Sequence, residues 1–67
     1  MLVESAAIRA VDYDRIRRRL QVTFVSGERY AYDAVPGEVH RAFVEADSKG
    51  RFFQAQIRGR YRFDRLS

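Results

Sequence analysis

His40 is the single histidine of the chain, and it is the first residue to consider for acid–base chemistry. A histidine base needs a nucleophile or a positioned partner, and the chain has no cysteine to act as nucleophile or thiolate ligand. In the helix that we expect over residues 36–47, His40 neighbours Phe43 and Val44 at spacings of three and four. We therefore expect a partly exposed surface histidine, neither a catalytic base nor a metal ligand.

Asp12 and Asp14 are two carboxylates on the same side of a strand if the strand continues through them. Such a pair can bind Mg²⁺ or work as acid and base. Here the pair flanks a turn beside arginines at positions 15, 17, 18 and 19, so turn hydrogen bonds and surface ion pairs are the simpler interpretation. The four glycines are isolated and form no phosphate-binding loop. We expect no enzyme, no catalytic residue, no cofactor and no metal.

The segment from Arg58 to Phe63 is the best candidate for nucleic-acid binding. Its arginines and aromatics alternate, and guanidinium groups can hold phosphates while rings stack on bases. We predict contacts from Arg58, Arg60 and Arg62. The alternative is that Tyr61 and Phe63 pack inward, which would leave Arg60 and Arg62 as ordinary solvated side chains.

A second candidate surface is the polar face of the expected sheet, with Arg19 and Arg29 as the predicted contacts. The exposed face of an antiparallel sheet is normally polar, so solubility alone also explains it. From Ser48 onward the chain has six basic residues against one acid, within a net charge of +4. A basic C-terminal part of this kind attracts polyanions.

Three strands are expected to position these residues, over residues 6–13, 18–25 and 28–33. In the second strand, Leu20, Val22 and Phe24 alternate with polar residues. A three-residue loop at residues 25–27 would set Tyr30 opposite Val22 and Tyr32 opposite Leu20, on the apolar face. A two-residue loop would place both tyrosines on the polar face, where they could form a stacking platform. We favour the three-residue loop because it gathers the apolar residues and puts Gly27 at a left-handed position.

Two helices follow, over residues 36–47 and 51–57, with Ser48 as the cap of the second and Gly59 as its end. Residues 60–63 read as a short extended segment that could be a fourth strand. The fold class is α+β: a three-stranded antiparallel meander, then two short helices on one face, in a single domain over residues 1–67. The predicted core is Ile8, Leu20, Val22, Phe24, Tyr30, Tyr32, Val39, Phe43, Phe53 and Ile57.

These segments, in this order, resemble the KTSC domain, a family named for its place at the C-terminus of some lysyl-tRNA synthetases and also found as small bacterial proteins. The resemblance covers about residues 5–66 and rests on Val11-Asp12-Tyr13-Asp14, Leu20-Gln21-Val22-Thr23-Phe24, Tyr30-Ala31-Tyr32, Val35-Pro36, Ser48-Lys49-Gly50-Arg51-Phe52-Phe53 and Ile57-Arg58-Gly59-Arg60-Tyr61. The resemblance implies no catalytic residue. It marks Tyr30 and Tyr32 as a hallmark pair with a structural or binding role, and it suggests RNA as a partner through the synthetases.

The first functional hypothesis is thus a small basic module that binds RNA weakly, and the second is a protein-interaction or oligomerisation module. No apolar run approaches the roughly 18 residues that a membrane span requires, and the N-terminus has no signal-peptide pattern. We expect a cytoplasmic protein with no membrane partner and no small-molecule substrate.

Overall fold

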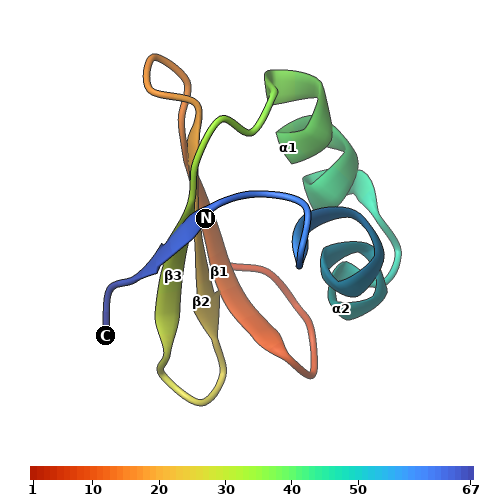
Figure 1. Cartoon of the computed structure of the whole chain (residues 1–67). Helices are drawn as coiled ribbons and strands as arrows, with labels where there is room; N and C mark the ends of the chain where they lie inside the picture. Colours follow the sequence, from red (N-terminus) through yellow and green to blue (C-terminus); the bar gives the residue numbers. More distant parts are fainter.

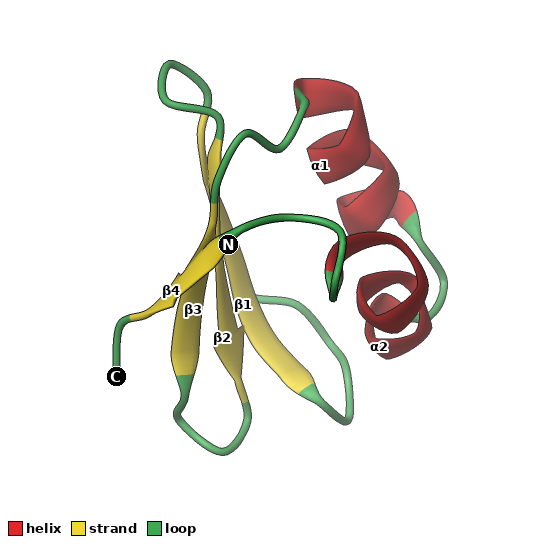
Figure 2. Ribbon diagram, in the orientation of Figure 1, coloured by secondary structure: helices red, strands yellow, loops and turns green.

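A four-stranded antiparallel sheet with helices on one face makes up the architecture of this computed structural model, which describes all 67 residues (Figures 1 and 2). The strands are β1 (Ile8–Asp14), β2 (Arg19–Phe24), β3 (Arg29–Tyr32) and β4 (Phe63–Arg65), in the spatial order β1-β2-β3-β4. The helices are α1 (Gly37–Glu45), α2 (Lys49–Phe52) and the π-helical turn η1 (Phe53–Ile57). The predicted α+β meander with two short helices is confirmed.

The register between β2 and β3 follows the three-residue loop. Leu20 pairs with Tyr32 and Val22 with Tyr30, so both tyrosines lie on the apolar face. Gly27 has a φ of +98°, the left-handed conformation that closes this loop. The prediction of loop length, and with it the side of the sheet that the tyrosines occupy, is confirmed.

β1 contains a bulge that the alternation of its sequence did not indicate. The pairing with β2 shifts between Ile8 and Ala10. The extra residue brings Ile8 and Val11 to the same face although they are three apart, and both are fully buried. Simple alternation along this strand would put Ile8 and Ala10 on one side and Val11 on the other, which is wrong because of the bulge.

The core otherwise resembles the predicted one, with three exchanges. Phe24, Tyr30 and Val39 are only partly buried against it, whereas Val11, Ala31 and Val35 are buried. Val35 turns inward directly after Ala34, which has a left-handed φ of 57°. Phe43 of α1 is fully buried and stacks on Phe52, with 5.3 Å between the ring centroids.

The second helix begins two residues earlier than predicted and widens before it ends. The Ser48 hydroxyl accepts a hydrogen bond from the Arg51 backbone N–H at 3.2 Å, so the predicted cap is confirmed. The Arg58 N–H then bonds to the Phe53 carbonyl five residues back, at 2.9 Å, which is the π-helical pattern. Phe53 and Ile57, at the two ends of this turn, are both buried in the core.

The C-terminal strand lies later in the chain than the predicted segment at residues 60–63. Residues 58–62 cross from η1 to the sheet, with Gly59 at a φ of +77°, and β4 then pairs Phe63 with Tyr32 and Arg65 with Tyr30 (Figure 2). The other edge of the sheet is covered in part by the N-terminus, where Leu2 bridges to Ala10. No helix has the length and apolar character needed to span a membrane.

Candidate nucleic-acid interface

Five aromatic rings from distant parts of the chain gather on the helix-covered face of the sheet, and we call them the aromatic cluster: Phe24, Tyr30, Tyr32, Phe53 and Phe63. Phe53 reaches the cluster from η1, with its ring centroid 5.2 Å from Phe24 and 5.6 Å from Tyr32. Phe63 reaches it from β4 and lies 5.6 Å from both tyrosines. The strand register brings them together, because Phe63 pairs with Tyr32 across the β3–β4 ladder.

A groove of about 320 Å³ opens beside the aromatic cluster, and we call it the aromatic groove. All five rings of the cluster line it, together with the polar side chains of Glu28, Gln54 and Arg58. Gly59 also lines it, at the turn where the chain leaves η1. The groove therefore combines a broad apolar wall with one acid and one guanidinium group at its rim.

Tyr30 and Tyr32 form the inner wall of this groove and not an open platform. Tyr32 is 5% exposed, and Tyr30 is half-buried. Burial is the main cause that raises the pKa of the Tyr32 hydroxyl; neighbouring Tyr30 adds to the rise and Arg58 opposes it. The exposed ring of the cluster is Phe63, at 52% exposure.

Arg58, Arg60 and Arg62 are exposed and none of them forms an ion pair. Arg58 donates a hydrogen bond to the Gln54 side-chain oxygen at 3.0 Å, and Arg60 donates to the Ala55 carbonyl at 2.9 Å. Both acceptors are uncharged, so no carboxylate neutralises these three guanidinium groups locally. Arg58 lines the aromatic groove, and Arg60 and Arg62 follow it in the segment that leads from η1 to β4. We call these residues the arginine trio.

Arg19 and Arg29, the other two predicted contacts, lie on the opposite face of the sheet. Arg19 forms ion pairs with Asp33 and, at 3.0 Å, with Asp64. The Asp64 hydrogen bond is the main cause that raises the pKa of Arg19 above its ordinary value. Arg29 donates to the Ser67 hydroxyl at 3.1 Å. The fold thus separates the five predicted arginines into the trio between η1 and β4, of which Arg58 lines the groove, and two residues on the outer face.

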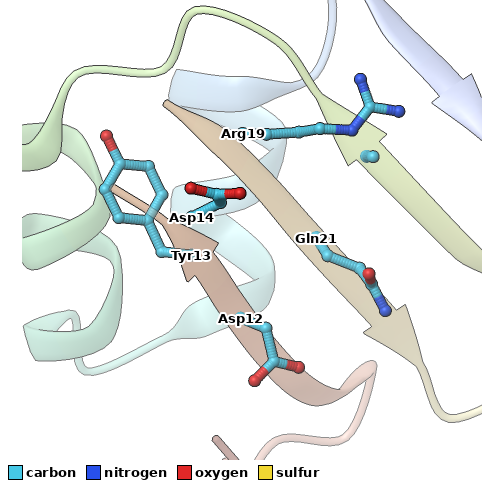
Figure 3. Close-up of a pocket in the computed structure, with 6 residues that line it drawn as sticks. Asp12, Tyr13, Asp14, Arg19 and Gln21 are labelled. Atoms are coloured by element: carbon cyan, nitrogen blue, oxygen red, sulfur yellow. The ribbon is translucent and has the colours of Figure 1, made fainter. Parts of the chain in front are cut away.

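The outer face has a shallow depression of about 330 Å³, where Asp12 and Asp14 project from β1 beside Gln21 and Arg19 of β2 (Figure 3). Asp12 pairs with the N-terminal amino group of Met1 at 2.6 Å. Asp14 accepts two backbone N–H groups of the following turn, each at 3.1 Å. These contacts agree with the expected turn and ion-pair roles, and no group of three or more acidic or histidine side chains gathers to hold a metal ion.

His40 stacks flat on Tyr13, with 4.5 Å between the ring centroids and 13° between the planes. The Tyr13 hydroxyl donates a hydrogen bond to the Val35 carbonyl at 2.5 Å. Burial, helped by the positive N-terminus, lowers the pKa of His40. The half-buried ring is therefore part of the packing between α1 and β1.

Phe63 is not among the predicted contacts, although it is the most exposed ring of the aromatic cluster. The alternation of arginines and aromatics up to Phe63 was the available signal. Whether its ring is open depends on the pairing of β4 with β3, which joins segments about 30 residues apart.

Known proteins resemble this chain over nearly its whole length. The sequence profile of the KTSC domain matches residues 4–61. The chain is 42% identical over 65 residues to an uncharacterized protein of Stutzerimonas stutzeri, an alignment that covers 96% of this chain and 92% of that protein. It is 34% identical over 64 residues to a lysine–tRNA ligase of Nostoc punctiforme, covering 96% of this chain and 11% of the ligase. A crystal structure of a KTSC domain protein from Yersinia pestis has a TM-score of 0.97 at 34% identity, covering 100% of this chain and 94% of the other.

Proposed function

The chain belongs to the KTSC domain family. From the arginine trio, and from the aromatic groove that Arg58 lines, we propose that it is a small, non-catalytic module that binds RNA. The observation behind the proposal is a run of three exposed arginines within five residues, none of which has a carboxylate partner and the first of which lines the aromatic groove. Arg19 and Arg65 already bind carboxylates, whereas Arg58, Arg60 and Arg62 have none. Unpaired guanidinium groups are free to hold phosphates through paired N–H donors.

The relatives supply a reason to choose tRNA as the first probe. A lysine–tRNA ligase, by its name, acts on tRNA, and about a tenth of the Nostoc punctiforme enzyme aligns with this chain. The weak, phosphate-centred mode of binding follows from the size of the site, because three arginines hold few phosphates.

The experiment is an NMR titration of the labelled chain with mixed tRNA at roughly 50 and 200 mM salt. Three phosphate contacts predict that affinity falls between about 20-fold and 40-fold over that range, because bound counterions are released from the RNA. We expect the shifts to lie around residues 58–62. No shift at the lower salt would overturn the proposal.

Charge reversal tests which arginines are responsible. We predict that Arg60→Glu combined with Arg62→Glu abolishes tRNA binding while the dispersed amide spectrum persists, since both side chains are exposed. The matched control is Arg9→Glu with Arg15→Glu, which changes the charge equally but lies in or next to β1, at the other edge of the sheet from β4. Equal loss in the two double variants would mean that net charge, and not this site, attracts the RNA.

The second candidate function is a protein-interaction or oligomerisation module. The observation in its favour is β4, an edge strand of three exposed residues with unpaired backbone groups on its outer side. Sedimentation of the chain over a range of concentrations at high salt distinguishes this function, because an apolar or strand-paired interface persists where phosphate binding fades.

A further inference from the structure

Phe63 differs from the other rings of the aromatic cluster in how it meets solvent. It is 52% exposed, whereas Phe53 is 4% and Tyr32 is 5% exposed. Its ring lies at 71° to Tyr30 and 38° to Tyr32, with both centroids at 5.6 Å. Phe63 is therefore held in place by the tyrosine pair while roughly half of its surface stays open.

The charge around Phe63 suits an anion more than a cation. Glu28 is the only acid that lines the aromatic groove, and Arg65 pairs with it at 3.1 Å. Arg65 also lies over the Tyr30 ring, 6.0 Å from its centroid, so one face of that ring is already occupied. Arg58 at the rim has no acid partner and remains available.

We propose that the aromatic groove receives one unpaired nucleobase of RNA, stacked on Phe63, while the arginine trio holds the adjoining phosphates. This inference rests on the proposed RNA-binding function and adds to it a single-strand preference. A base within a duplex already stacks on its neighbours and cannot offer a free face to a protein ring. A groove of about 320 Å³ is at the small end of the sites that enclose small ligands, which fits one nucleotide and not several.

The direct test uses Phe63→Trp, because the chain has no other tryptophan and the indole ring reports its own stacking. The probe is a single-stranded oligoadenylate of eight nucleotides, added to the full chain at low salt. We expect quenching of the tryptophan fluorescence upon binding. We expect much weaker quenching with an RNA duplex of the same length at equal nucleotide concentration.

The second arm measures affinity for the same oligonucleotide. Phe63→Ala should weaken binding between about 5-fold and 150-fold, the range found for the loss of one stacked base, and Phe63→Trp should retain it. Phe63→Leu is the control for packing, since leucine keeps an apolar contact with the tyrosines but cannot stack. We expect Phe63→Leu to weaken binding nearly as much as Phe63→Ala. If Phe63→Ala fails to fold, the fluorescence quenching of Phe63→Trp and the affinity of Phe63→Leu show whether a base stacks on residue 63.

The two proposals fail in different ways. Binding of tRNA that depends on Arg60 and Arg62, together with unchanged affinity in Phe63→Ala and no tryptophan quenching, would overturn the stacked base and leave RNA binding intact. Equal affinity for the duplex and the single strand would also overturn it. No binding of any RNA would remove both proposals.

Discussion

The guanidinium groups of this chain differ in the partners that they have already engaged. Arg19 reaches Asp64, a residue 45 positions away, and Arg65 reaches Glu28. In the arginine trio, Arg58 and Arg60 have only uncharged acceptors, and no ion pair includes Arg62. At the scale of residues, a basic composition therefore does not identify a binding site, because a paired arginine would have to break its ion pair before it could hold a phosphate.

His40 provides a pH-dependent prediction at the same scale. Its pKa is lowered in the folded chain, mainly by burial, so the unfolded state binds a proton at a higher pH than the folded state does. Between the lowered pKa and the ordinary value of 6.5 the unfolded state holds more protons, and stability therefore rises with pH. The contribution is fully present above pH 6.5 and is lost as the pH falls below it.

The measurement is urea unfolding at about pH 7.5 and 5.5, for the native sequence and for His40→Phe, which keeps an aromatic ring against Tyr13. We expect the native sequence to lose more stability on acidification than His40→Phe does. The titration of the carboxylates is common to both chains and cancels in the difference. The same pH dependence in both would show that His40 has equal proton affinity in the folded and unfolded states.

At the scale of elements, two local devices position the aromatic cluster. The three-residue loop between β2 and β3 sets Tyr30 and Tyr32 on the helix side of the sheet. The π-helical turn of η1 then brings Phe53 against Tyr32 and Phe24, and the chain leaves the turn at Gly59 towards β4. The site is thus assembled from one hairpin, one widened helix and one short strand.

The loop prediction concerns Gly27. We expect Gly27→Ala to destabilise the chain by about 1 kcal/mol, because a side chain at a φ of +98° meets its own backbone although nothing else lies within 4 Å. The control is Gly50→Ala in α2, where the added carbon would lie at an ordinary 3.8 Å from Ala7. That change should stabilise the chain by roughly 0.5–1 kcal/mol, since alanine favours the helix. Urea unfolding of both variants measures whether each substitution lowers or raises the free energy of unfolding. A loss of stability in Gly50→Ala as large as that in Gly27→Ala would contradict the conformational explanation.

At the scale of the whole molecule, the core is small: only 10 of the 67 residues are buried, and none of these is polar. The core of a chain of this size rarely supplies more than about 3–5 kcal/mol of stability. The fold that positions the groove side chains therefore has a small free energy of unfolding. Variants of the site should be chosen from exposed positions, as with Arg60, Arg62 and Phe63.

A substitution at Phe43 tests how small this free energy of unfolding is. Phe43→Ala removes a fully buried ring that stacks on Phe52, and such truncations cost about 3–5 kcal/mol. We expect this variant to be largely unfolded at 25 °C, with a collapsed amide dispersion in its NMR spectrum. Phe63→Leu is the comparison, because it changes a ring that is half exposed and should preserve the dispersion. A well-dispersed spectrum for Phe43→Ala would show that the core holds more free energy than its size suggests.

Features that depend on near neighbours in the chain could be predicted from the amino-acid sequence. The alternation in β2, the length of the loop at Gly27 and the Ser48 cap are local, and each lies where the pattern predicted. The order of the segments was also sufficient to identify the family. These features follow from backbone preferences and from the period of the apolar residues, which act over a few residues of chain.

Features that depend on contacts between distant segments became visible only in the folded chain. The bulge in β1 turned Val11 inward, and the pairing of β4 with β3 placed Phe63 at the groove instead of leaving residues 60–63 as the fourth strand. The ion pairs of Arg19 and the lack of one at the arginine trio also join, or fail to join, segments far apart in the chain. Distant segments compete to form the same backbone hydrogen bonds and to fill the same core. A short stretch of sequence contains only one partner of each such contact, so it cannot predict which contact forms.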